Sequence, residues 1–363
     1  MWQERPPRPR TPTTSPGGRE HASPVHALRG ALRLGPPRQH GPLTLWPLLC
    51  ARSARPPLAR RAPPCLLLAE ALYAGQAEVS ELRPRPIVDR LRVVNRARWP
   101  LLILFGEMLR GARQDRVATA SFLVPARREA EIGVACVEAG RWGSGRAGPG
   151  AEPERLARSE SLLAQALRCR LEQGLRVARL ACGGFAADQT DLWQAVAARL
   201  AREGVMAPTG TAAALRTRHA AWLAGARRAF PPQADQRGFV AAIGSAVAGL
   251  EVLGGVQELA AALPALVEAY ALDAGAARSE AEEPPRRAPR PDVLLAAAGG
   301  PARFEAPEPF LSALLQTEVR AAPSGAAGED WRLLSPRVRG CALTLGEAVM
   351  HLSAFPALLE GAP

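Results

Sequence analysis

The densest run of strand-like segments in the chain lies between Ile87 and Val137, and it limits the possible fold more than any other feature. Four or five short segments rich in Val, Leu, Ile and Phe follow one another there, separated only by turn residues. These residue types favour strands. Parallel neighbours need a crossover connection of about a dozen residues, so turns this short favour antiparallel pairing. The segment therefore predicts a mostly antiparallel sheet or sandwich.

Beyond the Gly/Pro-rich linker at 143–153 the apolar spacing becomes helical. Helices are expected at 154–179, 188–203, 211–230, 256–271 and 309–315, a hairpin at 238–253, and strands at 331–338, 341–345 and 348–355. The polar, Pro-rich stretch 275–291 is expected to be a loop. The fold class predicted is α+β: a mostly antiparallel N-terminal sheet, a helical middle and a C-terminal α/β segment.

One domain is expected over residues 42–356, with a β-rich part (42–142), a mainly helical part that includes the hairpin (154–273) and an α/β completion (292–356). Residues 1–41 are rich in Pro, Arg, Gly, Ser and Thr and show no apolar period, which indicates a disordered basic tail. Removal of residues 1–40 is expected to leave folding intact.

The formal net charge of +12 suggests nucleic-acid binding at first sight, but its distribution does not support that interpretation. Residues 1–62 carry 11 Arg and two acidic residues, whereas the remaining chain is close to neutral. The chain has no Lys and a single Asn, a skew typical of a GC-rich coding sequence. We therefore expect no specific nucleic-acid partner.

Cysteine and histidine usage limits the redox and metal chemistry. The six cysteines show no CxxC spacing, which favours reduced thiols in a cytoplasmic protein. Only two histidines lie outside the tail, so no multi-histidine metal centre is expected. No apolar run approaches the roughly 20 residues that span a bilayer, and no secretory signal is evident. The sequence leaves the cofactor open, including a carboxylate-held Mg²⁺ that arrives with a phosphorylated ligand.

Polar side chains crowd the turns of the β-rich part. The densest set is Glu107, Gln114, Arg116, Glu138 and Arg141. Arginine binds phosphate through its planar fork, glutamate and glutamine can bond ribose hydroxyls, and a partly buried glutamate can act as a general base. The same residues could instead form ion pairs at strand ends.

Three further polar residues are candidates, and two of them have a second interpretation. Asn95 is the only asparagine, which reflects either a specific need or chance. His351 sits in an apolar strand and is either a structural residue or a general acid or base. Gln189 follows Asp188, a candidate N-cap, at the start of a helix. Cys136 is expected to be buried and inert.

Several motifs occur in an order that resembles one bacterial family. They are Leu-Leu-Ile-Leu-Phe-Gly-Glu (101–107), Gly-Ala-Arg-Gln-Asp-Arg-Val (111–117), Cys-Val-Glu-Ala-Gly-Arg-Trp (136–142), Asp-Gln-Thr-Asp-Leu-Trp (188–193) and Met-His-Leu-Ser-Ala-Phe (350–355). This pattern is similar to the ARG and rhodanese-phosphatase-superfamily-associated proteins, where ARG stands for ADP-ribosylglycohydrolase. The similarity covers residues 42–356.

The resemblance implies a function in handling ADP-ribose or related NAD-derived compounds. The positions that match its motifs are Asn95, Gln114, Arg116, Arg141 and Gln189 as ligand-binding candidates, and Glu107, Glu138 and His351 as catalytic candidates. Two positions depart from the pattern: Arg113 replaces a usual Lys, and Glu251 an expected Asp. We therefore expect a protein that binds or processes a phosphorylated ribose, ADP-ribose or an NAD-derived molecule, without a membrane partner. The alternative is a non-catalytic scaffold for a neighbouring enzyme. The oligomeric state stays open.

Overall fold

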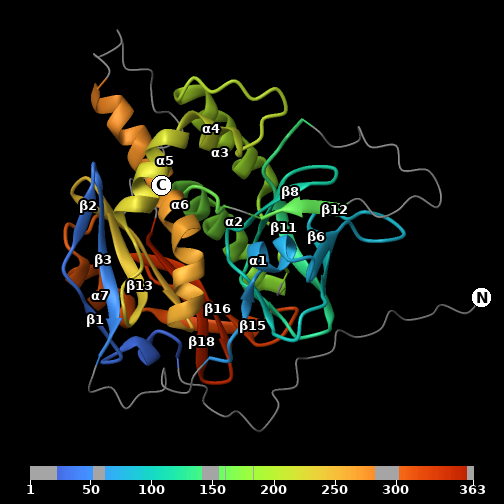
Figure 1. Cartoon of the computed structure of the whole chain (residues 1–363), viewed down its shortest axis with the longest axis horizontal. Helices are drawn as coiled ribbons and strands as arrows, with labels where there is room; N and C mark the ends of the chain where they lie inside the picture. The colour runs from blue at the N-terminus through green and yellow to red at the C-terminus, as the bar shows by residue number, and fades with distance from the viewer. Residues whose placement is uncertain are drawn as a thin grey trace, which may run out of the picture.

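The computed structural model describes residues 23–51, 62–140, 155–159, 161–182, 184–282 and 302–357, and its class is α+β, as predicted. A large antiparallel sheet and a small closed barrel form its two sides, and α2 (Gln165–Cys182) and α6 (Val256–Glu282) lie between them (Figure 1). Both helices contact the sheet, and α6 also contacts a strand beside the barrel. The polar residues that these helices bury include Arg168 of α2 and Glu268 of α6.

The large sheet has the strand order β1-β3-β13-β14-β18-β17-β16-β15, and β2 pairs with the same edge of β3 as β1 does. Its strands are β1 (Leu32–Leu34), β2 (Arg38–His40), β3 (Leu43–Cys50), β13 (Gln236–Ile243), β14 (Ala246–Leu253), β15 (Glu318–Pro323), β16 (Glu329–Leu334), β17 (Val338–Leu345) and β18 (Ala348–Pro356). The predicted N-terminal sheet thus continues through the hairpin β13–β14 into the C-terminal segment, and all its pairings are antiparallel.

Six strands close into a barrel in the order β11-β6-β5-β12-β8-β9. They are β5 (Ala77–Ser80), β6 (Arg90–Asn95), β8 (Met108–Gly111), β9 (Arg116–Ala118), β11 (Glu129–Cys136) and β12 (Arg155–Arg158). A smaller sheet lies alongside, made of β4 (Leu66–Leu67), β7 (Leu101–Ile103) and β10 (Phe122–Val124). Val79, Leu91, Val93 and Leu109 belong to the apolar cluster of the barrel.

Helices cover both faces of the large sheet. On the inner face α2 and α6 pack with α3 (Gln189–Arg202), α4 (Ala214–Arg218) and α5 (Ala220–Ala229). On the outer face α7 (Pro307–Leu315) packs with the short helix η1 (His26–Leu28). A further helix, α1 (Leu68–Tyr73), contacts the barrel. Helix α6 is long and apolar enough to cross a membrane, but 72% of its span is buried within the protein, as in a core helix.

The ordered chain begins earlier than the sequence predicted. Residues 23–41 had been assigned to the tail, yet they contain η1, β1 and β2. The main chain of β1 and β2 bonds to the edge of β3, and Val25 and Leu28 are buried in the outer apolar cluster. A few well-placed apolar residues are enough for this, although the average composition of the segment is polar.

Three element boundaries also differ from prediction. The helix expected from residue 154 begins at Gln165, because residues 155–158 form β12 and bridge β5 and β8. Helix α6 continues to Glu282, so the expected loop at 275–291 is helical at its start. Strand β15, paired with β16, was missed. Pairing partners distant in the sequence decide β12, and local propensity does not reveal them. Strand β15 instead forms a hairpin with its neighbour β16.

Candidate functional site

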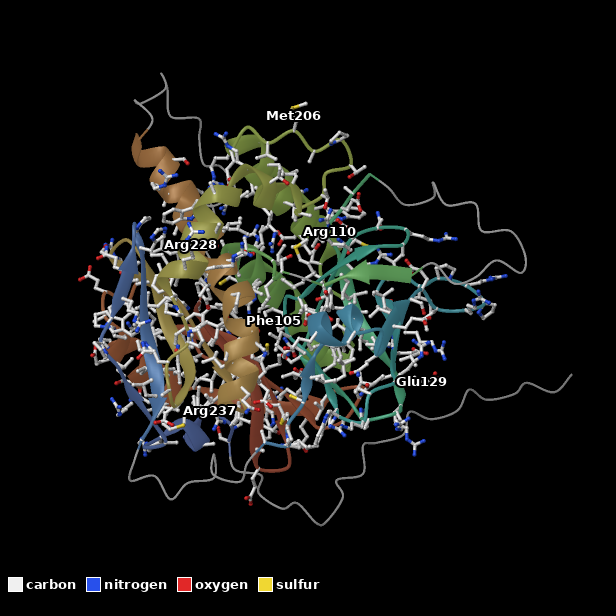
Figure 2. All side chains as sticks on the ribbon, viewed as in Figure 1. Phe105, Arg110, Glu129, Met206, Arg228 and Arg237 are labelled. Atoms are coloured by element: carbon white, nitrogen blue, oxygen red, sulfur yellow. The ribbon has the colours of Figure 1, made fainter. Side chains whose placement is uncertain are left out.

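The motif Phe-Gly-Glu (105–107) forms the turn between β7 and β8 and lies near the centre of the molecule, where Phe105 is labelled (Figure 2). Gly106 has a φ of +83°, a conformation that favours glycine. A Cβ atom at Gly106 would also lie 2.6 Å from Nε of Arg168, which is too close for any side chain. The turn therefore requires glycine at this position.

Glu107 is a buried carboxyl group with two hydrogen-bond donors. The main-chain N–H of Leu104 donates to Oε2 at 2.9 Å, and the hydroxyl of Ser159 donates to Oε1. Burial raises the pKa of Glu107 to about 7, and the two hydrogen bonds only partly oppose this. Such a carboxyl group can both give and take a proton near neutral pH.

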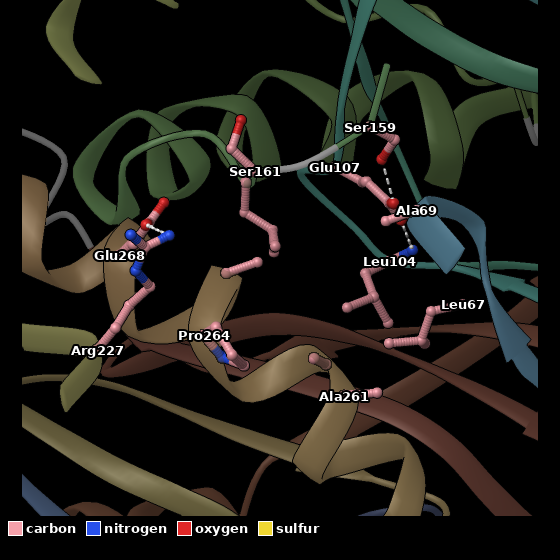
Figure 3. A pocket seen from close by; sticks show the side chains of 13 residues that line it. Leu67, Ala69, Leu104, Glu107, Ser159, Ser161, Arg227, Ala261, Pro264 and Glu268 are labelled. Atoms are coloured by element: carbon pink, nitrogen blue, oxygen red, sulfur yellow. Dashed lines mark hydrogen bonds and ion pairs between the residues drawn. The ribbon is translucent and has the colours of Figure 1, made fainter. Parts of the chain in front are cut away.

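A cavity of about 150 Å³ opens between Glu107 and α6 (Figure 3). Glu107 and Ser159 lie at one end, and Arg227 lies at the other with Glu268. Apolar side chains form much of the wall between them: Leu67, Ala69, Leu104, Leu162, Ala261, Ala262, Pro264 and Ala265. Ser161 adds a further hydroxyl to the lining.

Two arginines surround the carboxylate of Glu268. Arg227 Nη1 lies 3.0 Å from Oε1 of Glu268, and Arg216 Nη1 lies 2.7 Å from Oε2. Glu268 is almost fully buried, whereas about half of the Arg227 side chain is exposed. Two positive charges around one negative charge leave this end of the cavity with an excess positive charge.

His351 belongs to a fully buried network centred on Glu251. The guanidinium of Arg168 donates to Glu251 at 2.7 Å, the hydroxyl of Tyr270 donates at 2.9 Å, and His351 Nε2 lies 3.2 Å away. Ser353 also donates to this carboxylate. Burial opposes ionisation, but Arg168 and His351 outweigh it and lower the pKa of Glu251 to about 2.

The far side of His351 contacts Ser121, whose Oγ lies 2.6 Å from Nδ1. A serine, a histidine and a carboxylate follow one another as in a hydrolase triad, but the ring nitrogens are exchanged, because the serine contacts Nδ1 and the carboxylate contacts Nε2. Ser121 is only 1% exposed, however, and it does not line the cavity beside Glu107. The geometry therefore favours a structural function for His351 over direct contact with a ligand.

Gln114, Arg116 and Glu138 lie together but do not line the Glu107 cavity. Arg116 is fully buried and donates to the carbonyl of Val88 and to Gln114, at 3.2 Å each. Gln114 donates to the carbonyl of Glu138. The Glu138 side chain accepts from the Asp115 main chain at 2.8 Å. These contacts support the ion-pair and turn interpretation of the predicted cluster. Arg141 lies outside the described residues.

Arg116 also forms an ion pair with the carboxylate of Glu81. Its Oε1 lies 3.6 Å from Arg116 Nη2, and both side chains are buried. Glu81 follows β5, so this pair closes one end of the barrel. Burial also raises the pKa of the nearby Cys136 thiol to about 11, as expected for an inert cysteine.

Asn95 and Gln189 each bond to the main chain. The amide of Asn95 donates to the carbonyls of Trp99, Val124 and Pro125, and its oxygen accepts from Ala97. Gln189 bonds to both the N–H and the carbonyl of Cys136 and so joins α3 to β11. Both amides are therefore used within the fold.

The family assignment rests on the whole domain. The sequence profile of the ARG and Rhodanese-Phosphatase-superfamily-associated Protein domain matches residues 31–355. The chain belongs to this family. Neither the curated proteins nor the solved structures gave a match.

In the part of the chain that the structure describes, Glu107 is the one residue lining this candidate cavity that the sequence predicted as a site residue. Ser159, Arg227 and Glu268 were not singled out, because serine and charged residues on helices and loops are common surface residues. Glu251 was noted only as a departure from the family pattern. A glutamate inside the apolar strand Gly-Leu-Glu-Val-Leu was the available signal, since charged residues are almost never fully buried without a partner. Among the described residues, no group of three or more His, Cys, Asp or Glu side chains could hold a metal.

Proposed function

We propose that this family member binds and processes a small phosphorylated sugar of the ribose type, free or as the end of ADP-ribose or another NAD-derived molecule, in the cavity between Glu107 and Arg227. The observation that carries the proposal is a buried carboxyl group with a pKa of about 7 at one end of a cavity with an arginine at the other. Proton transfer at neutral pH and anion binding are the chemistries these groups supply.

The size of the cavity limits what it can enclose. Small-molecule pockets usually measure roughly 300–1,000 Å³, whereas this cavity measures about 150 Å³. It is large enough for one sugar-sized group and too small for a complete dinucleotide. A larger ligand would place its sugar phosphate inside and the remainder outside, past the exposed guanidinium of Arg227.

The residues divide the chemistry between them. Glu107 takes a proton from a ligand hydroxyl or from water, or returns one to a leaving oxygen. Ser159 holds the carboxyl group in place through its hydrogen bond, and Ser161 offers a hydroxyl to the sugar. Arg227 binds the phosphate and exchanges part of its contact with Glu268 for the ligand, while Arg216 continues to neutralise that carboxylate. The cytoplasm of a bacterium is the expected setting, and neither nucleic acid nor a membrane has a part.

A non-catalytic scaffold is the second candidate. The observation that favours it is the internal use of Gln114 and Arg116, which contact one another and nearby main chain instead of a cavity. A scaffold makes no use of the carboxyl group of Glu107, so it predicts that a Glu107 variant keeps every binding property of the protein.

Thermal shift and turnover assays test the proposal. The purified chain is incubated separately with ribose 5-phosphate, ADP-ribose, NAD and ribose, and the experiment is repeated for Arg227→Ala and Glu107→Gln. Arg227→Ala should weaken binding of a phosphorylated ligand by about 1.5–3 kcal/mol, roughly 10- to 100-fold in Kd. Glu107→Gln should retain binding and lose turnover. The matched control is Arg228→Ala, the neighbouring exposed arginine of α5 that does not line the cavity. No shift with any phosphorylated compound, or equal effects at 227 and 228, would reject the proposal.

A further inference from the structure

Two arms of buried polar contacts begin at Glu251 and end at the turn that carries Glu107. The first arm runs through α2. Glu251 holds the guanidinium of Arg168 at 2.7 Å, and this guanidinium lies 5.5 Å from the ring centre of Phe105. The side chain of Arg168 also lies directly against Gly106, so closely that no Cβ atom could fit there. Arg168 thus fixes the turn from the side of α2.

The second arm runs through β18. Glu251 Oε2 contacts His351 Nε2 at 3.2 Å, and His351 Nδ1 contacts Ser121 Oγ at 2.6 Å. Ser121 Oγ in turn accepts a hydrogen bond from the main-chain N–H of Phe105 at 3.1 Å. Because this N–H already donates to Ser121, the hydroxyl proton is available for Nδ1, which assigns the ring proton to Nε2, toward Glu251.

We infer that Arg168, Glu251, His351 and Ser121 are positioning residues for the carboxyl group of Glu107. Together with Phe105 and Gly106 they form a closed ring of contacts, and Glu107 is the next residue along the chain. The ring fixes the main chain on one side of Glu107, while Ser159 fixes the carboxyl group itself. This inference rests on the proposed function, in which Glu107 is the group that transfers a proton.

The composition of the ring supports positioning over simple stabilisation. Arg168, Glu251 and His351 are all fully buried. A buried ion pair is weak evidence for stability, because well-packed apolar residues of similar volume often serve as well or better. What polar groups add is direction: each hydrogen bond defines where its partner must lie. In the ring these directional contacts end at residues 105–106, which immediately precede Glu107 at the cavity.

The test measures the pKa of Glu107 directly, in the full chain and without a ligand. Glutamate is labelled with ¹³C at the carboxyl carbon, the Glu107 resonance is assigned by its loss in Glu107→Gln, and the titration is repeated in Ser121→Ala and His351→Gln. The control is Tyr270→Phe, which removes another hydrogen bond to Glu251 but lies on neither arm. Ser121→Thr keeps the hydroxyl group and serves as the conservative variant.

If the ring positions Glu107, Ser121→Ala and His351→Gln loosen the turn, water reaches the carboxyl group, and its pKa falls by about one pH unit or more toward the ordinary value. Tyr270→Phe and Ser121→Thr should leave the pKa unchanged, although both can lower the melting temperature. An unchanged Glu107 pKa in Ser121→Ala overturns the inference. If His351→Gln does not fold, the Glu107 pKa in Ser121→Ala is sufficient for the test. The result is independent of ligand binding: a protein without any ligand could still show the shift, which would reject the proposed function and keep the positioning residues.

Discussion

Glu107 should make the stability of the protein fall as the pH rises through neutrality. Its pKa is raised from 4.5 to about 7 by burial, so the folded chain holds this proton more tightly than the unfolded chain. The stabilising contribution is complete below about pH 4.5 and is lost as the pH rises through about 7. Glu107→Gln cannot ionise and avoids this loss. The free energy of unfolding of Glu107→Gln, minus that of the natural chain, should therefore increase by up to about 3 kcal/mol between about pH 4 and pH 8. Urea denaturation at several pH values measures the difference, and parallel pH curves for the two proteins would contradict the expectation.

Arg116 and Arg227 should respond to substitution in opposite ways. Arg116→Ala removes a fully buried guanidinium that pairs with the buried Glu81 and bonds to Val88 and Gln114, and it should cost about 3–5 kcal/mol of stability, with no effect on the ligand-induced shift. Arg227→Ala removes a half-exposed guanidinium and should change stability by less than about 1 kcal/mol. The same substitution should weaken binding of the phosphorylated ligand. Melting temperatures with and without ribose 5-phosphate measure both quantities. If the Arg116→Ala variant kept its stability but its melting temperature no longer rose with ribose 5-phosphate, the ligand would bind at the barrel end instead.

Sequence patterns identified Glu107 but not the residues around it. The dense motif of residues 101–107 made this carboxyl group a candidate, and the structure places it at a cavity. Arg168 was hidden because a single arginine in an amphipathic helical pattern is normally on the exposed face. Burial of Arg168 depends on Glu251 and Ser353, which lie 83 and 185 residues away in the sequence. Such partners follow from the tertiary fold and not from local spacing.

Helix α6 contains a proline at an interior position, and that position lines the cavity. Pro264 has no N–H, so the carbonyl of Ala260 has no normal helical partner. Interior proline costs a helix about 3 kcal/mol, and such local costs are often found at functional sites. In this protein the unfavourable proline lies in the cavity wall opposite Glu107.

Replacement of this proline should therefore stabilise the protein and weaken ligand binding. Pro264→Ala restores a main-chain hydrogen bond and should raise the free energy of unfolding by about 1–3 kcal/mol, while loss of the proline ring changes the cavity wall opposite Glu107. Pro307→Ala is the matched control, because proline is favoured at the first turn of α7. Calorimetry and the ligand-induced shift report the two effects. A loss of stability in Pro264→Ala would mean that packing requires the proline ring.

Elements with a strong local signal were predicted well. The hairpin β13–β14 turns at Gly244, which has a φ of +60°, and its alternating apolar strands made it readable from the sequence. Strand β12 was read as helix because Glu-Arg-Leu-Ala-Arg has helical propensity. Its strand pairing with β5 and β8 completes the barrel and outweighs that preference.

At the scale of the whole molecule, loss of the first 40 residues should destabilise the large sheet. The deletion removes η1, β1 and β2, exposes the edge of β3 and opens the apolar cluster that contains Val25 and Leu28. The expected cost is roughly 3–6 kcal/mol. A deletion of residues 1–22 keeps all three elements and is the control. Circular-dichroism melting of both variants measures the effect. Equal melting temperatures would show that η1, β1 and β2 do not contribute to stability.

The order of strands in the large sheet has a consequence for biosynthesis. Strand β3 at residues 43–50 pairs with β13 at residues 236–243, and the sheet is completed only by β15 to β18. At ~5–20 residues per second, a ribosome needs about 10–40 s to make the chain between these two partners. During that interval β3 is exposed without its neighbour, whereas the barrel strands between them have all been made. The barrel can therefore form first on the nascent chain, and the sheet that carries Glu251 and His351 assembles near the end of translation.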